Sequence, residues 1–377
     1  MPSAVQRLRK KIKDEKEKAE RLQKEWYLLR PLLGYSNWAI FYLLLGGREA
    51  GKSYSVTDFF VHQFIHKGIP FNWIRLTDAQ ARKLLANNAQ ELVDPDIRRR
   101  YGLDLVTKGN HVYNVKREKR EVQHRDGTTG TVYEIVEEKL FARVFSLSTF
   151  YINKGSIFDK DFLKDPNMWY NIAIDEFQRE KGEKNTFDIL YALVNQLENL
   201  VRSTKERMRV FFIGNYLEDA SDILCAFNFI PEKFGRYKLK SKRAVIDYIE
   251  PSEGYKRRRD GSVADILMPT ASTFTNKIDQ DKSLITTARI KKPEKVIKFT
   301  KDKKDWYTVW DGNVIRQYNN ERLNTIIAMR PYLDERFDEG LRNKYIEVFD
   351  TRSFMFTNLI TFKRFQKNME MIAPRQH

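Results

Sequence analysis

Apolar and polar residues follow two different periods along this chain, and from residue 38 onward the two periods alternate. Compact apolar runs, typical of buried strands, occur at residues 38–45, 71–76, 168–174 and 209–213. Helical periodicity follows three of these runs, at residues 52–66, 78–90 and 186–201. Strands that alternate with helices in this way predict an α/β domain with a mostly parallel sheet.

Several stretches depart from the alternation and predict further parts. Residues 103–145 form short alternating segments broken by glycines, which predicts a β-rich insertion in a main domain of residues 35–232. Residues 1–34 predict a basic amphipathic helical extension, which could pack on a partner or on the main domain, or stay solvated. Basic residues crowd into 233–262, a predicted linker region, and a smaller mixed domain is expected at residues 263–377.

The charge balance changes the expectation about partners. Among 377 residues, 68 Lys and Arg stand against 51 Asp and Glu, so the net charge is +17. This charge favours a polyanionic partner. The alternative is a protein that is basic but binds no polyanion. Cys225 is the single cysteine, which excludes an internal disulfide and argues against a cysteine-based zinc site. Since no signal peptide or membrane-spanning run is recognisable, we expect an intracellular protein without a membrane partner.

The candidate chemistry begins at a phosphate-binding loop. Residues 46–53 match the pattern G-x-x-x-x-G-K-[ST] directly after an apolar run, a context that disfavours an ordinary glycine turn. In such a loop the backbone N–H groups face the phosphates, Lys52 reaches the β and γ phosphates, and the Ser53 hydroxyl reaches Mg²⁺. The expected nucleotide-binding residues are Gly46, Gly47, Arg48, Glu49, Ala50, Gly51, Lys52 and Ser53.

An acidic pair after a second apolar run would complete the site. Asp175 would take part in the Mg²⁺ shell, and Glu176 would orient and deprotonate the attacking water. The extra strand at residues 71–76 fits the additional-strand, catalytic-glutamate (ASCE) division of P-loop NTPases. Asn215 follows the strand at 209–213, where that division commonly keeps a γ-phosphate sensor, although a turn-forming asparagine explains it equally well. Hydrolysis is therefore favoured over nucleotide binding alone.

The nucleotide is expected to be ATP. Residues 276–279 match the N-K-x-D motif of guanine-specific GTPases, but a polar stretch precedes them, where that motif needs a buried strand. They also lie beyond the expected nucleotide domain, so we interpret the match as a coincidence. The predicted cofactors are ATP and Mg²⁺.

Together these residues resemble the double-stranded DNA packaging ATPases of phi29-like phages. The resemblance covers residues 38–249, adds Tyr54 to the nucleotide-binding residues, and includes the segments 46–54, 174–181, 206–209 and 227–231. It implies a homo-oligomeric ring, a pentamer, that docks on the capsid portal and drives double-stranded DNA into a preformed capsid. It places the protein in the host cytoplasm, transiently attached to the procapsid, and leaves open whether a scaffold RNA takes part.

The resemblance also implies roles for individual residues. Arg202 falls at the position of an arginine finger that acts on the neighbouring subunit, with Arg207 and Arg209 as rival candidates. Lys154 matches a lysine that also acts across the subunit interface. Arg75 matches an arginine that relays the nucleotide state.

For the C-terminal domain the resemblance implies a degenerate RNase H-type fold that binds nucleic acid or capsid without cutting. Asp302, Asp305 and Asp311 could instead suggest a two-metal nuclease, but acids among lysines are better interpreted as a solvated turn. Two alternative functions therefore remain: a large terminase with an active C-terminal nuclease, and a nucleotide-regulated nucleic-acid-binding scaffold without turnover.

Overall fold

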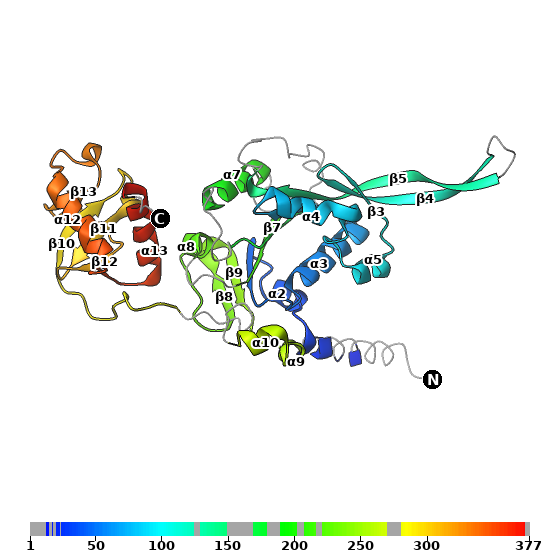
Figure 1. The fold of residues 1–377 in the computed structure, drawn as a ribbon, viewed down its shortest axis with the longest axis horizontal. Coiled ribbons are helices and arrows are strands. Elements are labelled where there is room, and N and C mark those ends of the chain that lie inside the picture. Colours follow the sequence, from blue (N-terminus) through cyan, green and yellow to red (C-terminus); the bar gives the residue numbers. More distant parts are fainter. Residues whose placement is uncertain are drawn as a thin grey trace. The chain divides into compact units, whose positions relative to one another are not determined.

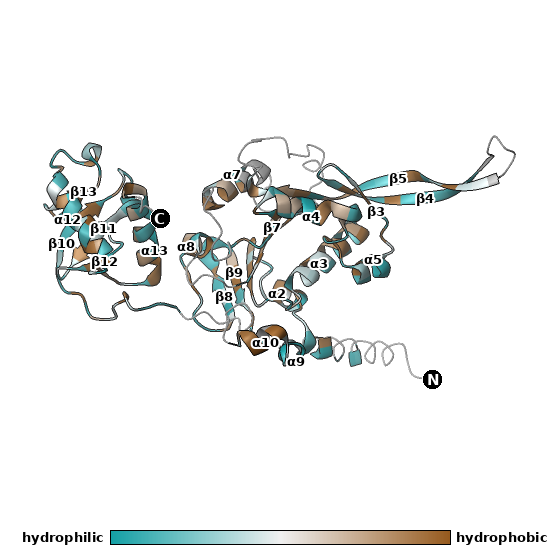
Figure 2. Cartoon of the chain, viewed as in Figure 1, coloured by the Kyte–Doolittle hydropathy of each residue, from teal (hydrophilic) through white to brown (hydrophobic). Residues whose placement is uncertain are grey.

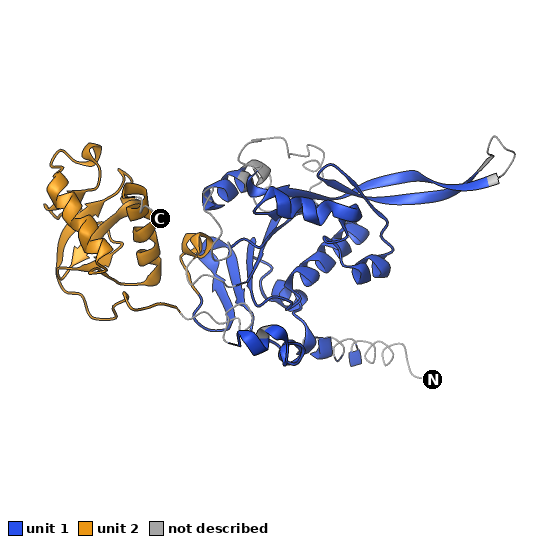
Figure 3. Ribbon diagram, viewed as in Figure 1, with its two compact units in different colours: residues 1–217, 231–278 blue, residues 218–230, 279–377 orange. Residues whose placement is uncertain are grey.

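The structure, a computed structural model, describes residues 13–14, 17, 20–22, 24–123, 129–148, 169–178, 189–201, 207–215, 221–269 and 280–373. The chain divides into two compact units, residues 1–217 with 231–278 and residues 218–230 with 279–377 (Figure 3). The described residues 221–230 thus belong to the second unit, whereas we expected them in the ATPase domain. No helix among the described residues is long and apolar enough to cross a bilayer.

The first unit is built on a nine-stranded sheet in the order β3-β4-β5-β2-β6-β7-β1-β9-β8 (Figure 1). The strands that bring the motifs together are β1 (Phe41–Leu45), β2 (Phe71–Arg75), β6 (Tyr170–Asp175) and β7 (Met208–Gly214). They are parallel and almost fully buried, which explains their continuous apolar sequences. The predicted α/β fold with a mostly parallel sheet is confirmed. The strand that separates β1 from β6 in space is β7, and β2 lies on the other side of β6.

Helices connect these strands in the predicted order. The helices of this part are α2 (Arg30–Tyr35), α3 (Lys52–Lys67), α4 (Asp78–Ala89), α5 (Pro95–Tyr101) and α7 (Ile189–Val201). Helix α3 buries Val56, Phe60 and Phe64 against the sheet, at the spacing of four that a single helix face requires. Helix α4 begins at a capping box in which Thr77 and Gln80 satisfy each other's backbone N–H groups.

The expected insertion at residues 103–145 is part of the sheet. It contains β3 (Leu105–Lys108), β4 (His111–Gln123) and β5 (Thr129–Ser146). The outer parts of β4 and β5 form a long two-stranded arm (Figure 1), while residues 142–146 of β5 pair in parallel with β2. A single strand therefore serves both the arm and the sheet.

The expected linker at residues 233–262 was wrong. These residues form β8 (Gly235–Leu239), β9 (Ala244–Tyr248) and α9 (Glu253–Arg259), and α10 (Val263–Leu267) follows. Strand β9 is fully buried and pairs in parallel with β1, because five mostly apolar residues interrupt the basic stretch. Helix α9 is hydrophilic and α10 hydrophobic (Figure 2).

The second unit has its own five-stranded mixed sheet in the order β13-β10-β11-β12-β14. Its strands are β10 (Pro293–Lys298), β11 (Trp306–Trp310), β12 (Val314–Arg316), β13 (Ile326–Ala328) and β14 (Met355–Phe356). Its helices are α8 (Asp222–Phe227), α12 (Glu339–Asp350) and α13 (Leu359–Ile372). Phe365 of α13 lies edge-on against Phe299 and Tyr307 at the centre of an aromatic core. Arg364 donates to the Cys225 carbonyl (2.6 Å), which fastens α8 to α13.

Candidate active site

The phosphate loop joins β1 to α3 at the carboxyl edge of the sheet. Gly51 closes the loop with a φ of 89°, a left-handed conformation that favours glycine, and α3 begins at the next residue. A β-carbon at Gly51 would also lie 3.3 Å from the Trp26 ring. The final glycine of the motif is therefore required by its backbone conformation and by a close neighbour.

Lys52 is buried inside the loop. Its ammonium group donates to the carbonyl oxygens of Gly46 (2.9 Å) and Gly47 (2.6 Å), and Asn215 Oδ1 lies 3.4 Å away. Burial lowers the pKa of Lys52 to about 8, although the carboxylates of Asp175 and Glu176 act in the opposite direction. The adjacency of β1 and β7 explains how Asn215 reaches the loop lysine.

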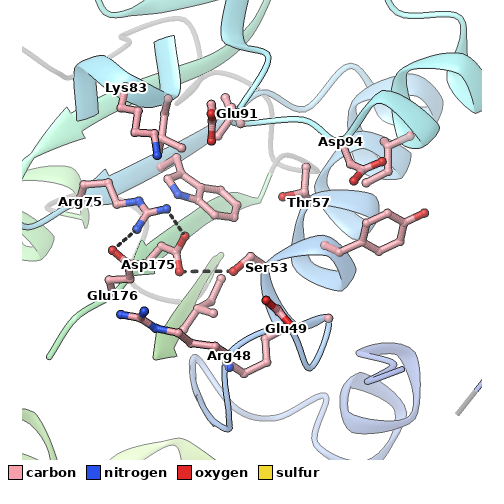
Figure 4. Close-up of a pocket in the computed structure, with 18 of the residues that line it drawn as sticks. Arg48, Glu49, Ser53, Thr57, Arg75, Lys83, Glu91, Asp94, Asp175 and Glu176 are labelled. Carbon is pink, nitrogen blue, oxygen red and sulfur yellow. Dashed lines mark hydrogen bonds and ion pairs between the residues drawn. The ribbon is translucent and has the colours of Figure 1, made fainter. Parts of the chain in front are cut away.

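The acidic pair lies at the end of β6, which β7 separates from β1. Figure 4 shows Asp175 between Arg75 and Ser53. Ser53 Oγ is 3.4 Å from Asp175 Oδ1. The Arg75 guanidinium bridges the two acids, at 2.9 Å from Asp175 and 2.6 Å from Glu176. Burial raises the pKa of Asp175, and Arg75 opposes that shift. The structure thus brings together four of the predicted site residues from three separate segments.

The turn after Asp175 exposes the second acid. Glu176 has a φ of 55°, its backbone N–H donates to the Ile213 carbonyl (2.8 Å), and half of its side chain is exposed. The following residue, Phe177, is buried so close to Gly214 that a β-carbon there would lie 2.8 Å from its ring. Packing of Phe177 therefore leaves Asp175 buried and Glu176 directed to the cavity.

A cavity of about 910 Å³ opens over the loop and the acidic pair. It is large enough for a nucleotide. The sequence did not predict the part of its wall that comes from β2, α4 and the segment before α5. This part includes Trp73, and Figure 4 shows Lys83, Glu91 and Asp94 of the same wall. These residues carry no motif, and only the fold brings them to the cavity.

The remaining loop residues differ in their surroundings. Tyr54 lines the cavity, but its hydroxyl is held by Asp96 (3.2 Å) and Arg100 on α5. Arg48 and Glu49 are exposed at the mouth of the cavity, and Glu49 forms an ion pair with Arg259 (3.2 Å). Tyr54 thus fixes α5 beside the loop.

The predicted residues that act across a subunit interface, Arg202 and Lys154, lie outside the described residues, as do residues 276–279. The rival arginine Arg209 is described. Its guanidinium lies 4.2 Å from the centre of the Trp169 ring and 5.7 Å from that of Phe59. Arg209 is therefore engaged by aromatic rings of its own chain, which makes it a weaker candidate for a finger.

The acids of the second unit accept hydrogen bonds from backbone N–H groups close to them. Asp302 Oδ1 accepts from the Lys304 N–H (3.0 Å), and the two oxygens of Asp311 accept from the backbone of Lys291 and Lys292 (2.9 Å each). Within the described residues, no three His, Cys, Asp or Glu side chains gather as metal ligands. The geometry favours the interpretation as turns over a two-metal centre.

Comparison with known proteins bears on these observations. No family model matches the chain. The chain is 22% identical over 329 residues to the DNA packaging protein of Bacillus phage phi29, covering 85% of this chain and 82% of that protein. It is 23% identical over 246 residues to the DNA packaging protein of Bacillus phage PZA, covering 64% and 62%. The resemblance to the phi29-like packaging ATPases is confirmed.

Solved structures agree at the level of the fold. The Phi-28 gp11 DNA packaging motor matches with a TM-score of 0.56 and 14% identity, over 93% of this chain and 99% of that chain. The bacteriophage Phi-29 viral genome packaging motor assembly matches with a TM-score of 0.56 and 20% identity, over 92% and 99%. The similarity to packaging motors thus spans both units.

Proposed function

We propose that this protein is an ATPase that drives double-stranded viral DNA into a preformed capsid. The observation that carries the proposal is the convergence of Lys52, Ser53, Asp175 and Glu176 on one cavity at the edge of the sheet. Similarity to a phage DNA packaging protein over most of both chains supports the same function.

The site residues divide the chemistry among them. Backbone N–H groups of the loop and the Lys52 ammonium bind the phosphates and stabilise the charge that develops on them. Ser53 and Asp175, 3.4 Å apart, would hold Mg²⁺, which neutralises phosphate charge when bound. Glu176 orients the attacking water and accepts its proton. Asn215, beside Lys52, is placed to sense the γ-phosphate.

The sheet order supports assignment to the ASCE division of P-loop NTPases. One strand, β7, lies between the strand that leads into the phosphate loop and the strand that ends in the acidic pair. A glutamate directly after the metal-binding aspartate is the second feature of that division. The ASCE assignment accordingly rests on β7, not on the strand at residues 71–76.

The partners follow from charge and resemblance. A chain of net charge +17 suits the phosphate backbone of DNA, read without sequence specificity. Docking on the capsid portal as a pentameric ring in the host cytoplasm is the arrangement that the resemblance implies. In the second unit, β10, β11 and β12 are antiparallel and β13 is parallel to β10, which is compatible with a degenerate RNase H-type domain.

Hydrolysis in the presence of DNA tests the proposal. We expect DNA-stimulated phosphate release that falls by about 10²- to 10⁴-fold in Glu176→Gln, since that substitution removes the general base. Glu339→Gln, an exposed acid of the second unit, is the matched control and should hydrolyse ATP normally. Robust hydrolysis by Glu176→Gln would remove this residue from its role. Absence of turnover in the wild type would favour the scaffold function.

Mixed rings test the contribution of Arg202. Arg202→Ala subunits lack the finger, and Glu176→Gln subunits keep the finger but lack the base. Mixing the two should restore hydrolysis at the Arg202→Ala sites that face a neighbour with an intact finger. Normal hydrolysis by a ring of Arg202→Ala alone would place the finger elsewhere.

A further inference from the structure

A short segment before α2 runs along the outer side of the phosphate loop. The Tyr27 N–H donates to the Ala50 carbonyl (2.9 Å), and the Leu29 N–H donates to Ser55 Oγ (2.8 Å). The Trp26 ring, just before these two bonds in the chain, packs against the loop at Gly51. The segment 25–29 therefore contacts the loop at its last turn and at the start of α3.

The bond to Ala50 has a direct consequence for the loop. The peptide between Ala50 and Gly51 is planar and trans, so its carbonyl and its N–H point in opposite directions. Because the Ala50 carbonyl accepts from Tyr27, the Gly51 N–H points away from the segment 25–29, and Gly51 itself lines the cavity. An inward N–H is what the loop needs to bind phosphate.

Helix α9 holds this segment in turn. The Arg258 guanidinium stacks on the Trp26 ring, 3.6 Å from its centre, and donates to the Glu25 carbonyl (3.0 Å). The Glu25 carboxylate forms ion pairs with Arg257 and Arg258. Gly254 is required here, because a β-carbon would overlap the Glu25 side chain. The indole of Trp26 thus lies between an arginine and the phosphate loop.

A partly buried hydrogen bond anchors the segment to the sheet. The Tyr27 hydroxyl donates to Asp247 Oδ2 (3.0 Å), and Arg236 Nε also contacts that carboxylate (3.3 Å). Asp247 lies on β9, opposite Leu44 of β1, the strand that leads into the loop. The segment is therefore fixed by the same pair of strands that carries the phosphate loop.

We propose that residues 25–29, held by α9, form a clamp that positions the phosphate loop for nucleotide binding, with Trp26 and Tyr27 as its positioning residues. The inference rests on the proposed function, since it assumes that the loop binds ATP. The clamp acts before binding, because it fixes a peptide orientation that the free loop would otherwise have to adopt at the expense of affinity. Loss of the clamp therefore weakens nucleotide binding more than it slows the chemical step.

Substitution of Trp26 in the full chain tests the clamp. Trp26→Ala should raise the Kd for ADP and the KM for ATP by about 10-fold and leave kcat nearly unchanged. Trp26→Phe, which restores a ring against Gly51, should recover most of the affinity. Tyr27→Phe keeps the backbone bond to Ala50 and loses only the anchor to Asp247, so a smaller rise is expected.

Leu32→Ala separates positioning from general destabilisation. Leu32 is fully buried in the core of the first unit and lies outside residues 25–29, so its truncation lowers the melting temperature of the unit and leaves the Kd for ADP unchanged. Equal losses of affinity in Leu32→Ala and Trp26→Ala would overturn the clamp, as would wild-type affinity in Trp26→Ala. These results leave Glu176→Gln as the separate test of ATP hydrolysis, so failure of the clamp and failure of the function are distinguishable.

Discussion

Acidic side chains follow or flank strands in both units, and their surroundings differ completely. In the first unit Asp175 and Glu176 end a buried parallel strand, and Arg75 from the neighbouring strand bridges them. In the second unit Asp302 and Asp311 lie in turns of a mixed sheet, where backbone N–H groups of nearby lysines occupy their oxygens. The residue types are the same, but the partners that the fold supplies are not.

The difference is one of strand direction. The carboxyl ends of adjacent parallel strands meet at one edge, so side chains from separate segments converge there. In antiparallel strands such as β10 and β11, consecutive turns lie at opposite edges, and an acid in a turn finds its own backbone first. A functional site is therefore predicted by acids together with parallel strands, not by acids alone.

Removal of the loop lysine is expected to have the largest effect. Lys52→Ala should abolish detectable ATP hydrolysis, a loss of about 10³-fold or more, because the buried cation is the main charge beside the phosphates. Lys83→Ala is the matched control, since Lys83 lines the same cavity but comes from α4, away from the converging strand ends. Steady-state phosphate release measures both. Equal losses in the two variants would mean that both lysines are needed and that the position of Lys52 at the strand ends has no special role.

Removal of the bridging arginine, Arg75, tests whether the ion pairs around Asp175 and Glu176 are needed for hydrolysis. Arg75→Ala leaves Asp175 and Glu176 without their shared cation, so the pKa of Asp175 should rise further. We expect hydrolysis to fall by about 10- to 100-fold, with partial recovery in Arg75→Lys. Rates measured against Mg²⁺ concentration check this. Unchanged Mg²⁺ dependence in Arg75→Ala would show that Arg75 does not support the metal-binding acid.

The pH dependence of nucleotide binding tests the burial of Lys52. Since its pKa is lowered to about 8, the free site loses its charge as the pH rises through that value, and the affinity for ATP should fall by at most roughly 10-fold per pH unit. The stability of the nucleotide-free protein should change in the opposite sense. Between about 8 and the ordinary value of 10.5 the unfolded chain binds more protons than the folded one, so Lys52 makes stability rise with pH.

Calorimetric titration with ATP and thermal melts over pH 7–10 measure the two trends. Lys52→Met removes the titrating group, so both the affinity for ATP and the stability should depend less on pH in this variant. A fall in affinity that persists in Lys52→Met would assign the pH dependence to another group.

The smallest effect is expected at the acids of the second unit. A variant with Asp302→Asn, Asp305→Asn and Asp311→Asn should keep ATP hydrolysis, because these side chains serve their own turns. The wild-type protein should leave plasmid DNA intact in Mg²⁺ or Mn²⁺. Metal-dependent cleavage that disappears in the triple variant would reinstate the terminase with an active nuclease.

Much of the first unit could be predicted because its signals are local. The apolar runs of β1, β2, β6 and β7 and the helical period of α3 are readable within a few residues. Strand β9 was missed because its five residues lie between basic segments, and its strand character depends on pairing with β1. Composition alone made that region resemble a linker.

The site was predictable to the extent that it consists of motifs. Lys52, Ser53, Asp175 and Glu176 belong to short patterns, and the structure brings them together. Tyr27 and Asp247 are 220 residues apart in the sequence, so no local pattern could predict the hydrogen bond between them. Contacts such as this one depend on the order of strands in the sheet, which the sequence pattern leaves undetermined.

The length of β5 has a mechanical consequence. The strand has 18 residues, so it spans about 60 Å from the arm to its last residue, Ser146. Ser146 pairs with Arg75, the residue that bridges the two acids. Tension applied at the outer end of the arm is carried by one continuous backbone to the ladder that holds this arginine. A single strand thus joins the arm to the arginine that bridges Asp175 and Glu176.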